Sequence, residues 1–485
     1  MLGYVRDALV AARHGASVET DIYFASFTLP DLMSYMLAGG ALSLTFLPMV
    51  SKRWHDEGQE GVDRLFGTVA ATMGAVLVVV TAAMWVAAPY AVSGLLPGFD
   101  AVAQAETVRL TRIVLPAQLF FYVGGLAGAT VMSRTRFIEA ALAPVIYNLT
   151  IIAFGWLLGP ALGIAAFSWG ALVGAALGPC GLLILAARRQ GLTWCPRLAF
   201  SDPDFRRFVV VSLPVMAGFS LVTVDEWLGR YFASRLEPGS VSWLQNARRL
   251  MLVPVSVLGQ AAGQATLPFL ARLRAEGKPE EAGRVLGDAL RVTGVLTLIA
   301  GAGLAVLALP AVAVFYERGA FTPADSAATA AALVPLAIGV PFWALQALAA
   351  RGFYAIEDTL TPMVLASTVT LLAVPVYFGL SHYGIAGLGA ATSIGMAVTA
   401  LATLWRLRAR LPVPLTAGGR AWLRGAAVAA LAAVAALATR LFLESPWAGA
   451  LGGGAVFAIV TLGASRLFRV AELDVLFRRL RRRAA

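Results

Sequence analysis

Residues 239–277 read GSVSWLQNARRLMLVPVSVLGQAAGQATLPFLARLRAEG and place two adjacent arginines inside an otherwise apolar stretch. A helix rises about 1.5 Å per residue, so Arg248 and Arg249 lie roughly 14 Å from Gly239, near the middle of a bilayer core about 30 Å thick. Placing one arginine at that depth costs on the order of 3 kcal/mol, so the pair needs a polar cavity, an acidic partner or a ligand. The stretch therefore predicts a membrane-spanning helix that carries a first candidate site.

The composition of the whole chain excludes an ordinary soluble protein. Of its 485 residues, 59% are hydrophobic and 13% are charged, whereas charged residues make up about a quarter of a typical globular domain. The net charge of +11 does not indicate a nucleic-acid partner, because the basic residues lie in short loops and at the C-terminus, where they report topology and phospholipid contact. Cys180 and Cys195 lack metal-ligand spacing, so no metal site or disulfide is expected. The chain is predicted to be an all-α polytopic membrane protein.

The apolar stretches are long enough for about fourteen transmembrane helices. The first is too short to cross a bilayer alone, and the natural start is expected to lie upstream of Met1. Gly124 and Gly128, in the fourth stretch, are expected to allow close helix approach. The predicted spans cover about 1–12, 22–50, 65–91, 110–132, 138–158, 164–187, 208–234, 239–277, 290–315, 327–350, 362–380, 385–404, 426–442 and 448–467.

Arginine and lysine gather in alternate loops between these spans. By the positive-inside rule these loops are cytoplasmic, and the alternation predicts that both termini are cytoplasmic as well. The intervening loops, such as 96–100 and 236–239, are short and poor in basic residues. The basic positions are Lys52, Arg53, Arg134, Arg136, Arg188, Arg189, Arg206, Arg207, Arg272, Arg274, Lys278, Arg351, Arg406, Arg408, Arg410 and the tail from Arg478 to Arg483.

An internal repeat divides the chain. The segment TFLPMVSKRWHDEG at 45–58 resembles ATLPFLARLRAEG at 265–277, at an offset of about 220 residues. Spans one to six then correspond to spans seven to twelve, and because each half has an even number of spans, the repeat axis lies along the membrane normal. We therefore predict an N-lobe at 1–200, a C-lobe at 201–412, and a last helix pair with a basic tail at 413–485, with a substrate cleft where the lobes meet.

The repeat also aligns buried charges. Arg6 and Asp7 in the first span correspond to Asp225 and Glu226 in the seventh, which adds two charged pairs to the arginines of the eighth span. One interpretation is mutual ion pairing, because the formal charges cancel. The other is a cavity that binds an anionic substrate through arginine and a coupling cation through carboxylates, because ionisable groups inside membranes are usually functional. Adjacent helix residues point about 100° apart, so the two arginines of the eighth span cannot both face one cavity squarely.

Four stretches together resemble a known family. They are LGYVRDALVAARHGASVETDIYFASFTLPDL, AGGALSLTFLP, GSVSWLQNARRLM and VLGQAAGQATLP. They resemble the MurJ (MviN) lipid II flippases of the multidrug/oligosaccharidyl-lipid/polysaccharide exporter superfamily, and the similarity covers essentially the whole chain. The resemblance implies a flippase that moves undecaprenyl-pyrophosphate-linked peptidoglycan precursor between the leaflets of the bacterial cytoplasmic membrane by alternating access, with the lipid tail in a groove of the last two helices.

The resemblance also implies roles for individual residues. Arg6 with Asp7 matches the family pair in the first span, and Arg249 matches the family arginine in the eighth, so Arg6 and Arg249 are expected to bind the pyrophosphate, with Arg248 as a third candidate. The chain departs from the family at Ser34, Tyr35 and Gly39, where basic or acidic residues are usual. No cofactor is implied; Asp225 or Glu226 is a candidate for a coupling cation, and the membrane potential is the other candidate drive.

Two alternative functions remain at this stage. A flippase for another polyprenyl-linked oligosaccharide, of exopolysaccharide or O-antigen type, would fit the missing basic residues of the second span. A polytopic membrane glycan ligase or transferase would need an acid–base constellation facing one leaflet, whereas the charges here lie at mid-depth. The expected partners are lipid II or a related polyprenyl-pyrophosphate glycolipid and membrane phospholipids, and a monomer is expected.

Overall fold

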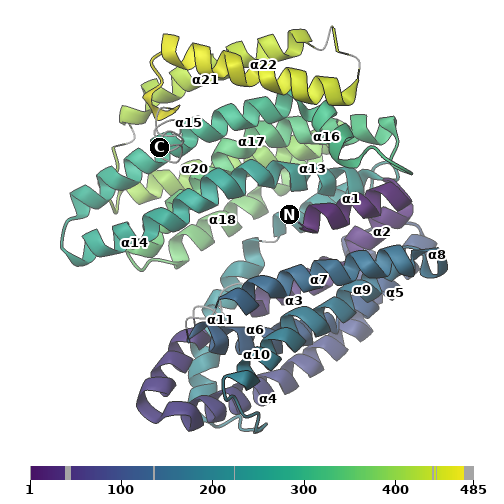
Figure 1. Cartoon of the computed structure of the whole chain (residues 1–485), viewed down its shortest axis with the longest axis vertical. Coiled ribbons are helices and arrows are strands. Elements are labelled where there is room, and N and C mark those ends of the chain that lie inside the picture. Colours follow the sequence, from purple (N-terminus) through teal and green to yellow (C-terminus); the bar gives the residue numbers. More distant parts are fainter. Residues whose placement is uncertain are drawn as a thin grey trace. The chain divides into compact units, whose positions relative to one another are not determined.

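A computed structural model of the chain describes residues 2–38, 45–134, 137–222, 224–414, 416–439, 442–443 and 445–473, and a thin grey trace marks the others in Figure 1. Within these ranges every regular element is a helix, as the composition predicts. The chain divides into two compact units, Met1–Val241 and Ser242–Ala485.

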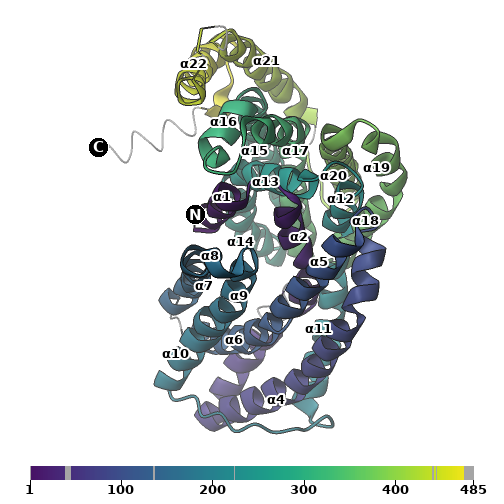
Figure 2. The same cartoon turned by 90° about the vertical axis from the view of Figure 1, so that its right-hand side faces the viewer.

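The first unit is built around a core of aromatic and aliphatic side chains. Phe66, Tyr122 and Phe208 are among its fully buried members, and the Tyr122 hydroxyl donates to the Val69 carbonyl at 2.9 Å, which ties two helices together. In Figure 2, α7 and α9 of this unit run side by side. Its elements are α1 (Leu2–His14), α2 (Val18–Ser26), α3 (Thr28–Ala38), α4 (Leu47–Leu95), α5 (Ala101–Val114), α6 (Ala117–Met132), α7 (Ile138–Leu157), α8 (Gly159–Leu162), α9 (Ala165–Ala175), η2 (Ala176–Leu182), α10 (Leu183–Arg189), α11 (Pro203–Val222) and α12 (Val224–Ala233).

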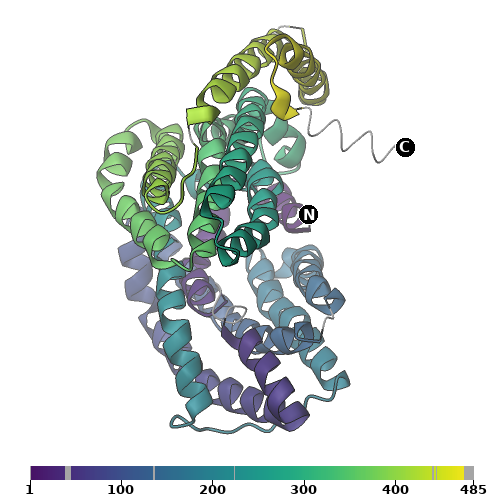
Figure 3. The same ribbon diagram turned by 90° about the vertical axis from the view of Figure 1, so that its left-hand side faces the viewer.

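The second unit has two apolar clusters. One surrounds Leu286, Phe353 and Leu407, and the other joins Val295 to Val428 in the last helix pair. Figure 3 shows that last pair, α21 and α22, lying together in yellow-green beside α15. The elements from here on are α13 (Ser240–Pro254), η3 (Val255–Gln260), α14 (Ala261–Ala275), α15 (Pro279–Val306), α16 (Ala308–Tyr316), α17 (Pro323–Ala355), α18 (Leu360–Leu372), α19 (Val374–Ser381), α20 (Gly384–Arg408), α21 (Thr416–Thr439) and α22 (Pro446–Leu467).

Eleven helices of the described residues are long and apolar enough to cross a membrane. They correspond to eleven of the fourteen predicted spans. Of the other three, α1 has 13 residues, and the described parts of the second and seventh spans are divided between α2, α3 and the start of α4 and between α11 and α12. The chain is therefore an all-helical, multi-pass membrane protein.

The stretch at 239–277 forms one continuous span, Ser240–Ala275. Pro254 has no N–H to donate to the preceding turn, and the helix continues beyond it through the π-type turns of η3. The predicted span is therefore confirmed, with a change of hydrogen-bond register about halfway along.

The charged segment between the second and third predicted spans differs from expectation. It was predicted to be a loop, but it is helical and belongs to α4, where Gly58 alone leaves the helical region, with φ 63° and ψ −145°. Glycine adopts positive φ without the steric cost of a side chain, so Gly58 breaks α4 into two differently directed parts. The prediction of a loop was wrong because polar and charged residues also form helices, and here they do so between two apolar stretches.

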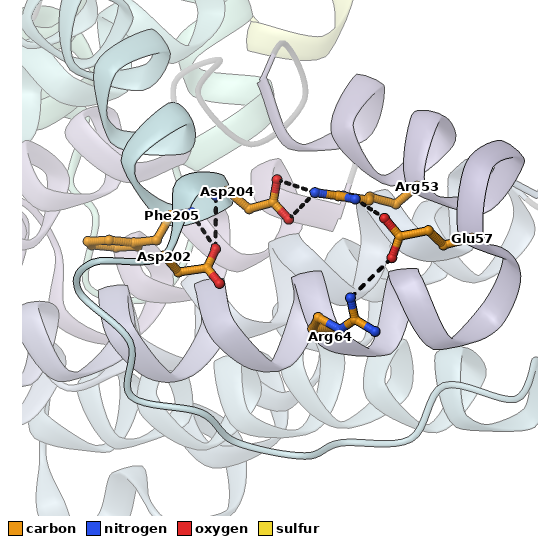
Figure 4. Close-up of polar contacts among 6 residues, drawn as sticks. All are labelled: Arg53, Glu57, Arg64, Asp202, Asp204 and Phe205. Atoms are coloured by element: carbon orange, nitrogen blue, oxygen red, sulfur yellow. Dashed lines mark hydrogen bonds and ion pairs between the residues drawn. The ribbon is translucent and has the colours of Figure 1, made fainter.

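Ion pairs fix the short first part of α4 against α11. Figure 4 shows Arg53 donating to both carboxylate oxygens of Asp204, each at 2.9 Å, while Glu57 accepts from Arg53 on one side and from Arg64 on the other. Asp202 accepts the backbone N–H of Asp204 at 2.8 Å and so caps the start of α11. The basic and acidic residues of this end of the unit therefore stabilise the turn between two spans.

Gly124→Ala is expected to destabilise the first unit. A Cβ added at Gly124 would lie 2.0 Å from the Pro179 carbonyl oxygen of η2, so the close approach predicted for this glycine is confirmed. Forcing a methyl group into that contact should cost about 1–3 kcal/mol and lower the melting temperature in detergent. Gly74→Ala, at a helical position with open space around it, is the matched control. Equal melting temperatures for the two variants would contradict the close contact.

Candidate functional site

Arg248 of α13 is held by a polar group inside the second unit. Its side chain is 7% exposed, and its Nη2 donates to the Thr392 hydroxyl of α20 at 3.1 Å. That hydroxyl donates to the Leu388 carbonyl and lies 2.7 Å from the hydroxyl of Tyr377, so it accepts hydrogen bonds from both Tyr377 and Arg248. Arg248 therefore contributes to the packing of α13 against α20.

Arg249 follows directly but faces different surroundings. Successive residues of a helix point about 100° apart, and Arg249 is half-buried where Arg248 is buried. The prediction that the two arginines cannot face one cavity equally agrees with this difference. Arg249 is thus the more accessible of the two cations to a ligand.

Arg6 and Asp7 lie next to one another in α1 and form an ion pair. Arg6 Nη2 is 2.8 Å and Arg6 Nε 2.9 Å from Asp7 Oδ1, and Asp7 is almost fully buried. A guanidinium that gives two donors to one carboxylate oxygen keeps further N–H groups for other acceptors. The pair therefore offers an oriented, partly neutralised cation within a helix of the first unit.

The carboxylates of the seventh predicted span lie in the first turn of α12. Asp225 and Glu226 are both half-buried, and Glu226 Oε2 is 3.9 Å from Arg230 Nη2, one helical turn further on. Arg230 is itself buried and donates to Thr28 Oγ1 at 2.9 Å and to Asp31 Oδ2 at 3.1 Å. Glu226 thus belongs to a network that joins α12 to α3.

Sequence reasoning missed Arg230. Its i, i+4 spacing from Glu226 inside an apolar span was a usable signal, because such a pair meets on one helix face. Of the expected groups, the structure pairs Arg6 with Asp7 and Glu226 with Arg230, and it bonds Arg248 to Thr392. Ser34 is half-buried, whereas the Tyr35 side chain, Gly39, Arg136 and the C-terminal arginines lie outside the described residues.

The charged side chains inside the described spans include guanidinium groups that suit an anionic ligand. In the described ranges there is no group of three or more histidine, cysteine, aspartate or glutamate side chains that could hold a metal ion. Guanidinium groups bind phosphate oxygens through paired N–H donors, and more strongly in a low-dielectric setting than in water. An all-helical membrane fold with arginines and carboxylates inside its spans is typical of proteins that move a substrate or an ion through the membrane.

Comparison with known proteins supplies the family. The family model described as lipid II flippase MurJ matches residues 10–453, and the chain belongs to this family. A probable lipid II flippase MurJ of Rhizobium meliloti is 29% identical over 428 residues, which cover 86% of this chain and 80% of the relative. The lipid II flippase MurJ of Burkholderia cenocepacia is 28% identical over 422 residues, covering 84% and 81%. These matches confirm the resemblance found in the sequence.

Solved structures agree on the fold. A lipid II flippase MurJ in an inward closed conformation superposes with a TM-score of 0.83 at 24% identity, covering 96% of both chains. An inward-facing multidrug resistance MATE family transporter of the MOP superfamily gives a TM-score of 0.71 at 15% identity, covering 86% of this chain and 94% of that one. The protein is therefore a multi-pass transporter of the bacterial inner membrane and not an enzyme, and the exopolysaccharide and glycan-transferase alternatives are not favoured.

Proposed function

We propose that the protein moves lipid II, the undecaprenyl-pyrophosphate-linked peptidoglycan precursor, from the cytoplasmic to the periplasmic leaflet by alternating access. The observation that carries this proposal is the match of the lipid II flippase family to residues 10–453, nearly the whole chain. The curated relatives named as lipid II flippases are covered over about four fifths of their own length, which supports the same cargo.

Arg6 and Arg249 are the proposed pyrophosphate ligands. Arg6 is oriented by its ion pair with Asp7, and Arg249 is the half-buried arginine of α13. Each can give two parallel N–H donors to phosphate oxygens, a geometry that favours arginine over lysine. Arg248 stays a third candidate, and its hydrogen bond to Thr392 favours a role in fixing α13 rather than direct contact with the cargo.

The carboxylates are the proposed coupling elements. Asp225 and Glu226 lie at the start of α12, where binding of a cation would change the charge balance around Arg230. The membrane potential is the other drive, because moving one charge across it is worth about 2.3 kcal/mol per 100 mV. A transport rate that follows the potential at constant cation concentration would favour the second drive.

The proposed topology is the one that loop charge and the repeat favour. It has fourteen spans and both termini in the cytoplasm, with an N-lobe at 1–200, a C-lobe at 201–412 and a last helix pair with a basic tail at 413–485. The alternation of basic and non-basic loops supports the orientation. The protein acts as a monomer surrounded by phospholipids, with anionic lipid at the basic tail.

Complementation tests the proposal. A bacterial strain depleted of its own lipid II flippase is expected to resume growth and normal cell shape when it expresses this chain. A strain blocked in the export of another polyprenyl-linked polysaccharide is expected to gain nothing. Rescue of the second strain without the first, at matched membrane levels of protein, would overturn lipid II as the cargo.

A further inference from the structure

A pocket of the first unit is lined by none of the residues assigned to transport. It has a volume of about 460 Å³ and is formed by α4, α5 and α9. In Figure 2 the last two of these helices lie beside each other. Two arginines and two tryptophans dominate the lining, which comprises Trp85, Arg109, Arg112 and Trp169 together with smaller apolar side chains.

The depth of the pocket follows from the sequence of its helices. Residues 113–132 are mainly apolar, carry no charged side chain and give about 30 Å of helix, the thickness of the bilayer core, so Arg112 marks the level at which that core begins. Trp85 and Trp169 are 44% and 41% exposed, and tryptophan is enriched at the membrane–water interface. The pocket therefore lies at the headgroup level of the leaflet near the turn between α4 and α5.

Arg112 is held in place by Trp85. Its Nε donates to the Trp85 carbonyl oxygen at 3.0 Å, and its guanidinium carbon lies 4.2 Å from the centre of the indole ring. Both contacts restrain the side chain, and within the described part of the chain the terminal Nη groups make no ion pair. A restrained guanidinium with donors available is suited to a phosphate.

The charge of the pocket favours an anion. Arg109 is neutralised by Glu106, with Nη2 to Oε1 at 2.5 Å and Nε to Oε2 at 2.8 Å. Arg112 has no such carboxylate among the described residues. Glu106, Arg109 and Arg112 together therefore leave one net positive charge at the edge of the hydrocarbon core. A counter-ion stabilises a cation more strongly at this position than in water, because the low dielectric strengthens the attraction between the two charges.

We propose that this pocket binds the phosphate of an anionic glycerophospholipid, with Arg112 as its main ligand. The phosphate lies against the guanidinium of Arg112 beside Trp85 and Trp169. The acyl chains run along the lipid-facing side of α4 toward the membrane centre, past the exposed Ala82 and Val78, which precede Trp85 by three and seven residues. The lipid is a bound ligand of the first unit and not the cargo, so this proposal goes beyond the flippase activity.

Native mass spectrometry of the purified full-length chain tests this site. Phosphatidylglycerol is expected to bind, and Arg112→Gln is expected to weaken binding about tenfold, because one charge-assisted hydrogen-bonding group is lost. Arg235→Gln is the matched control: Arg235 is also stacked on an aromatic ring, Tyr231 at 4.6 Å, but does not line the pocket. The control is expected to bind the lipid as the unchanged chain does.

Further measurements identify the occupant. Zwitterionic phosphatidylethanolamine should bind more weakly than phosphatidylglycerol, and inorganic phosphate should not displace the lipid at equal concentration. Arg112→Lys keeps the positive charge but not the planar guanidinium with its parallel N–H donors, so its affinity for the lipid should be intermediate. An intermediate affinity would show that Arg112→Gln weakens binding rather than folding. Equal phosphatidylglycerol binding by Arg112→Gln and the unchanged chain, or displacement by inorganic phosphate, would overturn the lipid site. Neither result depends on lipid II transport.

Discussion

Replacing Arg249 with alanine is expected to prevent this protein from sustaining growth of a strain that lacks another lipid II flippase. A hydrogen bond to a charged group is worth about 1.5–3 kcal/mol, so losing one from the transport path should slow translocation about 10- to 150-fold. Arg249 is the half-buried cation of α13 and the one that matches the family arginine. Growth rate and cell shape during depletion of the resident flippase measure the effect.

Two variants define what the Arg249 result means. Arg272→Ala removes an arginine from the same continuous span, but its side chain is 78% exposed and pairs with Glu276, so growth should be unchanged. Arg249→Lys keeps the charge and should restore part of the function, because lysine cannot present two parallel donors. Full growth with Arg249→Ala, at the membrane level of the unchanged protein, would remove Arg249 from the pyrophosphate site.

Arg230→Met is expected to have the largest effect on stability. It leaves Asp31 without its arginine and removes the hydrogen bond to Thr28, so α3 and α12 lose their polar connection. Breaking a fully buried ion pair costs about 3–5 kcal/mol, and because the Asp31 side chain is 32% exposed, we expect about 2–4 kcal/mol. A lower melting temperature of the purified protein in detergent measures the loss.

A double variant separates the ion pair from simple loss of packing. Arg230→Met combined with Asp31→Leu removes both charges of the 3.1 Å pair and should recover much of the lost stability. Glu226 also loses its contact with Arg230, but that contact is longer, at 3.9 Å, and the Glu226 side chain is 40% exposed. Arg235→Met, at an exposed arginine five residues further along, should leave the melting temperature unchanged. If the double variant is as unstable as the single one, the contribution of Arg230 is packing by its aliphatic stem rather than ion pairing.

The apolar pattern was sufficient to predict most of the fold. A run of about twenty apolar residues predicted the helix from Ile138 to Leu157, and the longer, mainly apolar stretch around Arg248 and Arg249 predicted the helix from Ser240 to Ala275, because backbone groups in hydrocarbon must be hydrogen-bonded internally. The same pattern gave no sign that the charged segment before Gly58 continues as helix. A soluble helix and a loop both lack apolar runs, so composition could not distinguish them there.

The candidate site was less predictable because its contacts are distant in sequence. Arg248 donates to Thr392, 144 residues away, and Arg230 to Asp31, 199 residues away. Position along one helix indicated the charged pair Arg6 with Asp7, and the i, i+4 pair of Glu226 with Arg230 was missed. Tertiary packing sets the rotation of a helix about its axis. That rotation decides whether a given arginine faces a ligand or a neighbouring helix.

Direct translocation in purified vesicles tests the central claim. The protein is reconstituted with lipid II that carries a fluorophore on its headgroup, and a membrane-impermeant reductant added outside quenches only the outward-facing molecules. We expect quenching to proceed to nearly all of the label with this protein, and quenching beyond the first half to be about 10- to 150-fold slower with Arg249→Ala. Quenching that stops at about half with the unchanged protein, while the vesicles remain sealed, would contradict the assignment as a lipid II flippase.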